Sequence, residues 1–238
     1  MNIEGLNISE LNQNTADSLV IKENKIIRSK FVEKTEQCVK RGIDIIGALF
    51  GVIMLIPITI GVYIANIIAK DKGPIFYNTQ RIGKDGKLFK MYKFRSMVVG
   101  ADDKLKEYLE QNPEAKEEYK KYKKLKEDPR ITKVGNFIRK TSIDEFPQFI
   151  NVLKGEMTLV GPRPYLPREK EDMKDYYSSI VKCKPGITGF WQIHGRSNTT
   201  FEDRLRMDVK YSNIKTLKTD IKILLSTIKH VITKEGAI

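Results

Sequence analysis

Residues 42–70 have the sequence GIDIIGALFGVIMLIPITIGVYIANIIAK, in which the 25 residues from Ile45 to Ala69 include no charged side chain. Uninterrupted apolar runs of this length are typical of membrane helices, because about 20 residues at about 1.5 Å each cross a hydrocarbon core. A buried helix of a soluble protein is the alternative, but 25 uncharged residues are more than a core helix of such a domain needs. The stretch therefore predicts association with a membrane.

Pro57 lies at the centre of this stretch and argues against a simple crossing. Each flanking half has 12 residues, which at about 1.5 Å per residue cover about 18 Å of a hydrocarbon core about 30 Å thick. Six basic residues lie in 25–41 and six in 70–90, so the positive-inside rule assigns no orientation. We expect a re-entrant helix-break-helix, with Thr59 as a candidate donor to carbonyls freed at the break. A kinked span is the competing interpretation, since membrane helices tolerate proline.

The composition of the whole chain limits the classes of partner and site. A net charge of +13 predicts an anionic partner: nucleic acid, a membrane surface or a phosphorylated substrate. Cys38 and Cys183 lie far apart with no CxxC pattern, and His194 and His230 form no metal-binding motif. A disulfide framework and a transition-metal site are therefore not expected, whereas magnesium held by carboxylates remains open.

Three further patterns predict a helical protein with a small hairpin. Residues 75–97, IFYNTQRIGKDGKLFKMYKFRSM, alternate apolar and polar side chains around Asp85-Gly86, which indicates a β-hairpin. Residues 101–128 are highly charged and predict a solvated helical segment interrupted near Pro113. The C-terminal residues 214–234 predict an amphipathic helix suited to the protein core or to a lipid surface. Its apolar side chains, at spacings of three and four, are Ile214, Leu217, Ile221, Leu225, Ile228 and Ile232.

Two adjacent acids, Asp144 and Glu145, stand out in the segment TSIDEFPQF, residues 141–149. Ser142 followed by Glu145 fits a capping box, and Pro147 suits the first turn of a helix that begins at about residues 143–144. On these residues alone, the cap is favoured over a catalytic pair.

Four cations of the sequence could bind a phosphate beside the acids. Arg163 stands in a rigid Gly-Pro-Arg-Pro segment, Arg139 precedes the acids, and Lys93 and Arg95 lie in YKFRS. Arginine binds phosphate through a planar fork of donors. Any one of these residues, taken singly, is more often a solvated surface charge.

From about Lys40 to the C-terminus, the chain resembles the monotopic phosphoglycosyl transferases, the bacterial sugar transferases that begin exopolysaccharide, capsule and glycoprotein glycan assembly. Ile56-Pro57 replaces the frequent Ser-Pro, and KFRSM replaces KFRTM. The four-helix N-terminal bundle of the long members has no counterpart, so the resemblance implies a catalytic core alone. The motifs that carry it are KRGIDIIG, GPIFYNTQRIGKDGKLFKMYKFRSM, DPRITKVGNFIRKTSIDEFPQFINVLKGEMTLVGPRP, KPGITGFWQIHGRS and RLRMDVKYSNIKTLKTDIKILLSTIKHVI.

The resemblance implies a mechanism and residues for it. Asp144 is the expected nucleophile, and Glu145 is expected to help hold Mg²⁺, with a helix N-terminus aimed at the site. The implied reaction transfers a sugar 1-phosphate from a UDP-sugar to undecaprenyl phosphate, through an aspartyl-phosphosugar intermediate, with release of UMP. Glucose or galactose is the favoured sugar, with amino sugars open. Phosphate-binding roles are expected for Lys93, Arg95, Arg139, Arg163 and Arg196.

The expected fold is α+β and mainly helical, with a re-entrant membrane helix broken at Pro57, interfacial amphipathic helices, a small β-hairpin and a globular catalytic part. The expected segments are a polar lead-in (1–40), the re-entrant helix (41–70) and a cytoplasmic catalytic domain ending in the amphipathic helix (71–238). This arrangement is monotopic, on the cytoplasmic face of the inner membrane, with the lipid bilayer as a partner; a monomer and a homodimer are both open.

Two other functions compete with the transferase. A membrane-tethered nucleic-acid binder would explain the positive charge and the basic, aromatic LFKMYKFRS segment. The sequence has no RNP, KH or helix-turn-helix pattern, so nucleic acid is not expected as a partner. A non-catalytic membrane scaffold is the other alternative. Neither function gives a purpose to the acid pair.

Overall fold

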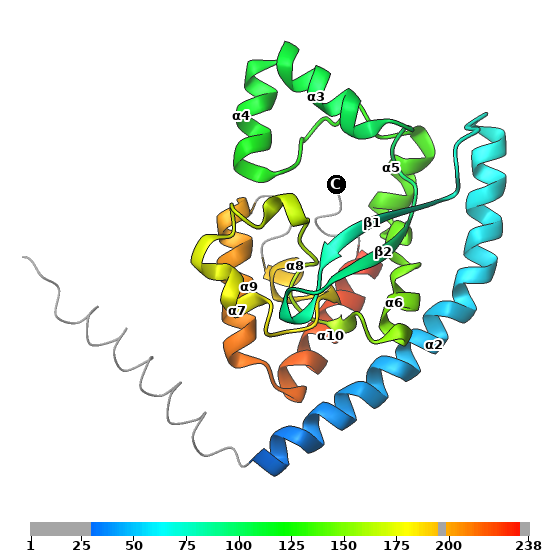
Figure 1. Cartoon of the computed structure of the whole chain (residues 1–238). Coiled ribbons are helices and arrows are strands. Elements are labelled where there is room, and N and C mark those ends of the chain that lie inside the picture. The colour runs from blue at the N-terminus through cyan, green and yellow to red at the C-terminus, as the bar shows by residue number, and fades with distance from the viewer. Residues whose placement is uncertain (1–29, 195–198, 234–238) are drawn as a thin grey trace, which may run out of the picture. The chain divides into compact units, whose positions relative to one another are not determined.

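The computed structural model describes residues 30–194 and 199–233, which form a mainly helical structure with small sheets (Figure 1). The chain divides into two compact units, Met1–Arg41 and Gly42–Ile238. In the first unit the described residues belong to the beginning of a long helix. The second unit groups the apolar stretch together with the predicted catalytic domain.

The described elements follow one another along the chain with short connections. In order they are α2 (Lys30–Ile68), β1 (Phe76–Ile82), η1 (Lys84–Gly86), β2 (Leu88–Phe94), α3 (Ala101–Gln111), α4 (Pro113–Tyr122), α5 (Lys133–Lys140), η2 (Ile143–Glu145), α6 (Gln148–Lys154), β3 (Thr158–Val160), η3 (Pro167–Glu169), η4 (Lys174–Tyr176), α7 (Tyr177–Ile180), β4 (Gly186–Thr188), α8 (Phe190–His194), α9 (Phe201–Ile214) and α10 (Leu217–Thr233).

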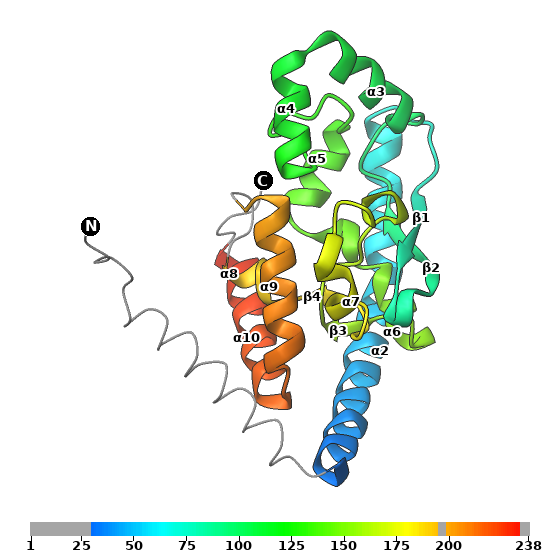
Figure 2. The same ribbon diagram turned by 60° about the vertical axis from the view of Figure 1, so that its left-hand side comes forward.

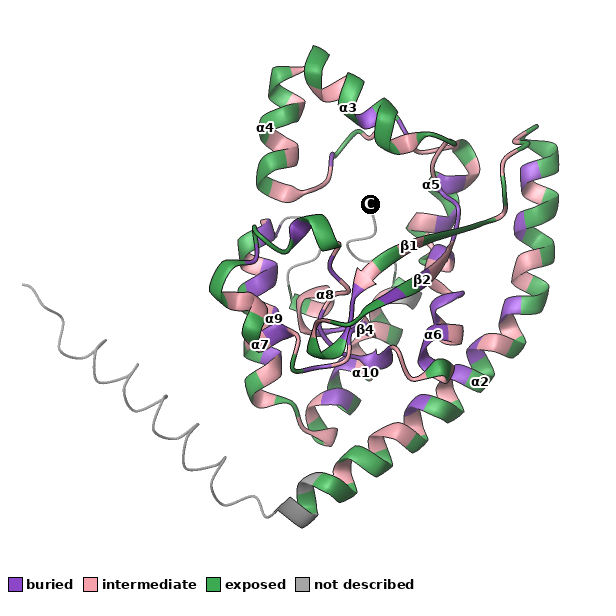
Figure 3. Cartoon of the chain, viewed as in Figure 1, coloured by how far each residue is buried: buried purple, intermediate pink, exposed green. Residues whose placement is uncertain are grey.

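Within the second unit, α2 has one buried face and one exposed apolar face. Asp44, Ala48, Leu55 and Val62 are buried against the rest of the unit. The opposite side is exposed (Figure 3) and carries large apolar side chains, mostly isoleucines. Only 22% of the most apolar window of the helix is buried, and the helix is long and apolar enough to cross a membrane. The uncovered apolar face supports the predicted membrane association.

Polar and close-packing contacts attach α2 to the catalytic part of the unit. The carboxylate of Asp44 accepts hydrogen bonds from the Thr158 hydroxyl (2.8 and 2.9 Å) and from the backbone N–H of Leu159 (2.9 Å). At Gly51 an added side chain would overlap the ring of Phe149, so α2 passes close to α6. These contacts hold α2, with its exposed apolar face, directly against the elements that surround the acid pair.

The predicted break at Pro57 is not confirmed, because α2 continues as one helix through this residue. Figure 1 shows the helix changing direction along its length. Proline removes one backbone donor from a helix, and neighbouring hydroxyls can bond the carbonyls around such a site. The hydroxyl of Thr59 donates to the carbonyl of Leu55 (2.7 Å), one turn earlier. Thr59 therefore donates a hydrogen bond to a carbonyl near Pro57, as predicted, but it does so within an unbroken helix.

The predicted hairpin is confirmed. Strands β1 and β2 pair antiparallel, with Phe76 opposite Phe94 and Ile82 opposite Leu88. Asp85 and Gly86 at the turn have φ of 58° and 76°, the left-handed conformation that Asp-Gly turns adopt. The second small sheet pairs β3 with β4 in parallel, with Thr158 opposite Gly186.

The predicted charged helical segment is also confirmed, as α3 and α4 with Pro113 as the first residue of α4. Figure 2 shows the two helices together at one end of the second unit. Their surface is mostly exposed, and Leu105 is a buried apolar residue on α3. The end of α4 contacts other elements, as described below.

Helix α10 forms where it was predicted, but most of the predicted apolar stripe does not face the core. Ile223 and Asp220 are buried at 1% and 5% exposure, whereas Ile221, Leu225 and Ile228 are 43–63% exposed. The orientation follows from Tyr211 on α9, whose hydroxyl donates to the Asp220 carboxylate (2.7 Å). The side chain of Ile232 lies outside the described part of the structure.

Candidate active site

The acid pair lies in a tight turn between α5 and α6. Asp144 and Glu145 belong to the short 3₁₀ helix η2, and Ser142 before them adopts φ 56° without a capping bond from its side chain. Helix α6 begins only at Gln148. The predicted helical start at about residues 143–144 is met by η2, which begins at Ile143, but the predicted capping box is wrong because the Ser142 side chain makes no capping bond. The acids lie in η2 and precede α6. With α5 ending at Lys140, the chain passes into η2 within two residues, through the left-handed Ser142 instead of an extended cap.

Lys93 on β2 bridges the two acids. Its ammonium lies 2.8 Å from Glu145 Oε1 and 3.4 Å from Asp144 Oδ2. The Asp144 side chain is 10% exposed and that of Glu145 is 38% exposed, so the pair remains open to solvent mainly on the Glu145 side. A predicted phosphate-binding residue thus directly contacts the predicted catalytic pair.

The two acids have different electrostatic environments. Burial raises the pKa of Asp144, and the charge of Glu145 adds to this rise, against the opposing effects of Lys93 and Arg139. Burial also acts to raise the pKa of Glu145, but Lys93, Arg163 and Gln148 together outweigh it and lower that pKa. Environments that separate the pKa values of two neighbouring acids are typical of pairs with distinct chemical roles.

Arg139 on α5 lies in the electrostatic environment of the pair. Its Nε donates to the hydroxyl of Ser96 (2.9 Å), and its charge opposes the rise in the pKa of Asp144. At Gly135, one turn earlier, an added side chain would overlap the carbonyl of Ser96. This close approach brings α5 near the segment after β2, where it positions Arg139.

Arg95 has a different environment, although it lies two residues from Lys93. Its guanidinium donates to Asp71 (2.8 Å) and to the carbonyls of Pro74 (2.6 Å) and Met97 (3.0 Å). It lines a cavity of about 400 Å³ with residues of the α2 end and the α5 start, and neither acid lines that cavity. The structure therefore does not bring Arg95 together with the pair.

Arg163 is placed through its backbone. Its N–H donates to Asp208 Oδ2 (3.0 Å), and its guanidinium lies over the ring of Trp191, 5.7 Å from the centroid. Its charge contributes to the lowered pKa of Glu145. Arg196 lies outside the described residues, so its predicted role stays a prediction.

Two positioning residues were missed by the sequence analysis. Asn151 on α6 is fully buried; it accepts from the N–H of Tyr92 (3.1 Å) and donates to the carbonyl of Lys90 (2.7 Å), which attaches β2 to α6. Asp208 on α9 also accepts from the hydroxyl of Tyr165 (2.8 Å). The sequence does offer a sign of Asp208: this acid occupies a position on the apolar face of α9, with Phe201 and Leu205.

Comparison with known proteins shows similarity over most of the chain. A model of the bacterial sugar transferase family matches residues 35–234. The chain is 45% identical over 211 residues to the undecaprenyl-phosphate galactose phosphotransferase of Salmonella typhimurium, covering 89% of this chain and 44% of that protein. It is 38% identical over 197 residues to the UDP-glucose:undecaprenyl-phosphate glucose-1-phosphate transferase of Escherichia coli, covering 79% of this chain and 39% of that protein.

The relatives differ in length. The chain spans less than half of the two proteins above. It covers 87% of the exopolysaccharide production protein ExoY of Sinorhizobium fredii, to which it is 38% identical over 198 residues, 83% of this chain. The matched regions include the described acid pair and its surroundings.

Proposed function

Since the chain belongs to the bacterial sugar transferase family, we propose that it transfers a sugar 1-phosphate from a UDP-sugar to undecaprenyl phosphate and releases UMP. The relatives' names support a hexose, glucose or galactose, as the sugar. The relative named for exopolysaccharide production supports a place at the start of exopolysaccharide, capsule or glycan assembly.

The observation that carries this proposal is the bridged acid pair, Asp144 and Glu145 around Lys93. In the first step a carboxylate oxygen of Asp144 attacks the sugar-bearing phosphorus, and the bond from that phosphorus to the bridging oxygen breaks, so that UMP leaves. In the second step a phosphate oxygen of the lipid attacks the same phosphorus. The Asp144–phosphorus bond breaks, which restores the carboxylate.

Cations around the pair support this chemistry electrostatically. Lys93 favours the ionised form of Asp144, which is the nucleophilic form, against the effect of burial. Arg163 and Arg139 supply fixed positive charge near the two acids. Positive groups held in place before reaction stabilise the charge that develops on a transferring phosphoryl group.

Magnesium is part of the proposal, with Glu145 as its expected protein ligand. The donor chemistry fits, because Mg²⁺ prefers oxygen ligands and usually combines one or two carboxylates with substrate phosphates. Lys93 contacts one oxygen of each acid, so the other oxygen of each carboxylate is not bonded to Lys93. In residues 30–194 and 199–233, no three acidic, histidine or cysteine side chains lie close enough together to hold one metal ion. Bound there, the ion would neutralise charge on the diphosphate.

The proposal places the site at the cytoplasmic membrane surface. We propose that residues 41–70 enter one leaflet and return to the same side through a bend of the continuous helix α2, which changes direction along its length (Figure 1). The equal numbers of basic residues at both ends support this. The exposed apolar face of α2 supports contact with lipid. So do the exposed Ile221, Leu225 and Ile228 on α10, which have Lys222 and Lys229 as exposed neighbours.

The function is tested by measuring UMP release from the detergent-solubilised chain with Mg²⁺ and undecaprenyl phosphate, across a panel of UDP-sugars. We expect release with UDP-glucose or UDP-galactose. Omission of the lipid should leave a phosphosugar on Asp144, detectable by mass spectrometry. Absence of UMP release with every UDP-sugar would refute the transferase.

The topology is tested by thiol labelling of intact cells. Cys183 is buried, whereas Cys38 is exposed. We therefore suggest a Cys183→Ser background, in which Cys38 reports on the segment before the membrane and an added Lys126→Cys reports on the catalytic part. A membrane-impermeant reagent applied from outside should label neither cysteine, and both should react in lysed cells. Labelling of Cys38 alone in intact cells would establish a true span.

A further inference from the structure

A second group of cations lies around Trp191. The guanidinium carbons of Arg163 and Arg204 are each 5.7 Å from the centroid of the Trp191 ring. Arg204 is only 4% exposed, so its charge is largely removed from water. Two like charges near one ring repel each other, and this repulsion is relieved when an anion binds between or beside them.

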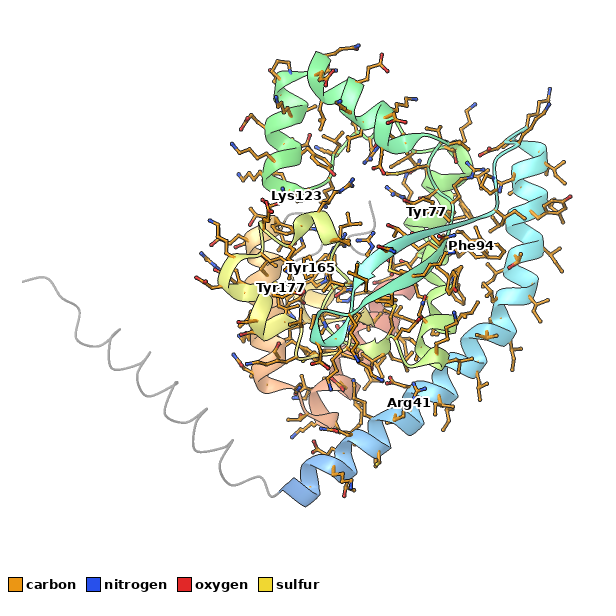
Figure 4. All side chains as sticks on the ribbon, viewed as in Figure 1. Arg41, Tyr77, Phe94, Lys123, Tyr165 and Tyr177 are labelled. Carbon is orange, nitrogen blue, oxygen red and sulfur yellow. The ribbon has the colours of Figure 1, made fainter. Side chains whose placement is uncertain are left out.

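The charged helical segment contributes to this group through the residues after α4. Arg204 donates to the backbone carbonyl of Tyr122, and Lys123 bonds to Asp172 (2.8 Å) and lies over the ring of Phe201 (5.6 Å). Figure 4 labels Lys123 there, together with Tyr165, whose ring also packs against Phe201. The end of α4 is therefore attached to the part of the unit that carries the cations.

Lys124 follows directly after these anchoring contacts. Burial, with the positive charges of Arg204 and Arg163, lowers the pKa of Lys124 to about 8. An effect of this kind requires the amine to lie within the electric field of both arginines. Lys124 lies two residues after Tyr122, whose carbonyl Arg204 bonds, so the segment that the sequence predicts to be merely solvated brings Lys124 beside the cationic group.

Arg81 on β1 completes the group. One of its terminal nitrogens donates to the carbonyl of Pro164 (3.1 Å), while its Nε is buried and finds no hydrogen-bond partner in the part of the chain that the structure describes. Burial and the charge of Arg163 lower its pKa to about 10. Trp191 Nε1 is also buried and has no hydrogen-bond partner among the described residues. Two buried donors that lack acceptors cost folding stability, unless a bound ligand supplies acceptor atoms for them.

The nearby acids offset this charge only in part, since the charges of Glu169 and Asp208 oppose the lowering of the arginine pKa values by burial. In the described part of the chain, none of the four cations forms a salt bridge with a carboxylate. Burial raises the pKa of Asp208 to about 7, so this acid carries only part of its charge near neutral pH. Glu169 is buried and accepts from the N–H of Leu166 (2.8 Å).

We propose that Arg81, Lys124, Arg163 and Arg204 form a binding site for a phosphate group of a substrate, with Lys124 supplied by the segment between α4 and α5. The identity of the ligand rests on the proposed function, which offers the diphosphate of a UDP-sugar and the phosphate of the lipid. Arg163 connects this site to the acid pair, because its charge also reaches Glu145.

The experiment compares Lys124→Met with the matched control Lys126→Met. Lys126 lies in the same segment and its side chain is exposed. Calorimetry on the full chain in detergent gives the Kd for UDP and, separately, for undecaprenyl phosphate. Trp191 is the only tryptophan of the chain, so its fluorescence reports binding beside the arginines. The Lys124→Arg variant keeps the charge and separates loss of charge from misfolding.

For one of the two ligands, we expect Lys124→Met to raise Kd by about tenfold, the effect of one lost charge-assisted contact. Lys126→Met and Lys124→Arg should stay within about twofold of the unmodified chain. The affected ligand identifies the source of the phosphate. Unchanged Kd values for both ligands in Lys124→Met, or an equal loss in Lys126→Met, would overturn the proposal. Lys124-dependent binding without UMP release would instead retain this site and reject the transferase.

Discussion

Lys93 and Arg95 are two residues apart, and the sequence offers no reason to separate them, yet they have opposite environments. Lys93 lies within β2 and contacts both acids. Strand β2 ends at Phe94, so Arg95 does not continue the alternation of the strand and instead bonds to Asp71 and two carbonyls. Basic residues that are close in the sequence therefore differ in their surroundings: one charged group lies at the acid pair, and the other is occupied by acceptors of the protein itself.

The largest effect is expected from the replacement of Asp144, one of the two acids that Lys93 contacts. Asp144→Asn should lower kcat by on the order of 10⁴-fold or more, because the nucleophile is lost. Rates of UMP release measure this effect, and the exposed acid Glu127, as Glu127→Gln, is the control. Because burial raises the pKa of Asp144, the ionised acid costs folding stability at neutral pH, so the variant should melt no lower than the unmodified chain. Activity retained by Asp144→Asn would remove the acid pair from the mechanism.

Replacing Lys93 itself should have the next largest effect. Lys93→Met leaves two adjacent acids without their shared cation, and we expect kcat to fall by about 10³-fold. Lys90→Met, on the same strand with an exposed side chain, should change kcat by less than about threefold. Equal losses in the two variants would show that the contact between Lys93 and the acids has no catalytic importance.

Arg95 should show the reverse behaviour. Arg95→Met leaves Asp71 and two carbonyls without their donor, and we expect a loss of about 3 kcal/mol in the free energy of unfolding, or about 6–12 °C in Tm. The kcat of the folded fraction should change by less than about twofold. The control is Arg206→Met, whose exposed pair with Glu202 should contribute less than about 1 kcal/mol. A loss of kcat without loss of Tm would place Arg95 in the catalytic site after all.

Asp208 is a buried acid that accepts hydrogen bonds from Tyr165 and from the N–H of Arg163. It offers a smaller test, which depends on pH. Its pKa is raised from 3.8 to about 7 by burial, so the folded chain holds this proton more tightly than the unfolded chain. Stability from this group is present below about pH 4 and is lost as pH rises through about 7, by about 3 kcal/mol between pH 5 and pH 8.

Asp208→Asn keeps an acceptor for Tyr165 and for the N–H of Arg163, but it cannot titrate. The difference in Tm between the variant and the unmodified chain should therefore shift in favour of the variant between pH 5 and pH 8. A difference in Tm that does not change with pH would show that Asp208 is ionised throughout this range.

The hairpin could be predicted from the sequence because its signal is local: an Asp-Gly turn between alternating residues, both with positive φ in the structure. The break between α3 and α4 at Pro113 was predictable for the same reason. The capping box at Ser142 was wrong because α5 ends only two residues earlier. Ser142 adopts a left-handed conformation between α5 and η2, and its side chain makes no capping bond. A local pattern could not include that constraint.

The face of α10 and the roles of the cations required the fold. Hydrophobic spacing predicted the helix, but the bond between Tyr211 and Asp220 orients it, which leaves Leu225 exposed. The uncharged run at residues 45–69 likewise predicted a membrane-facing helix, whereas the bonds of Asp44 to Thr158 and Leu159 attach that helix to the catalytic unit.

The sequence by itself determined the family, the acid pair and the helices and hairpin whose signals lie within a few neighbouring residues. Only the tertiary structure decided that Lys93 bridges the acids, that Arg95 does not, and that the segment carrying Lys124 lies against Arg204. The physical reason is range. Backbone preferences and periodicity act over a few residues, whereas the direction of a long charged side chain depends on partners distant in the sequence, such as the 51 and 52 positions that separate Lys93 from the two acids.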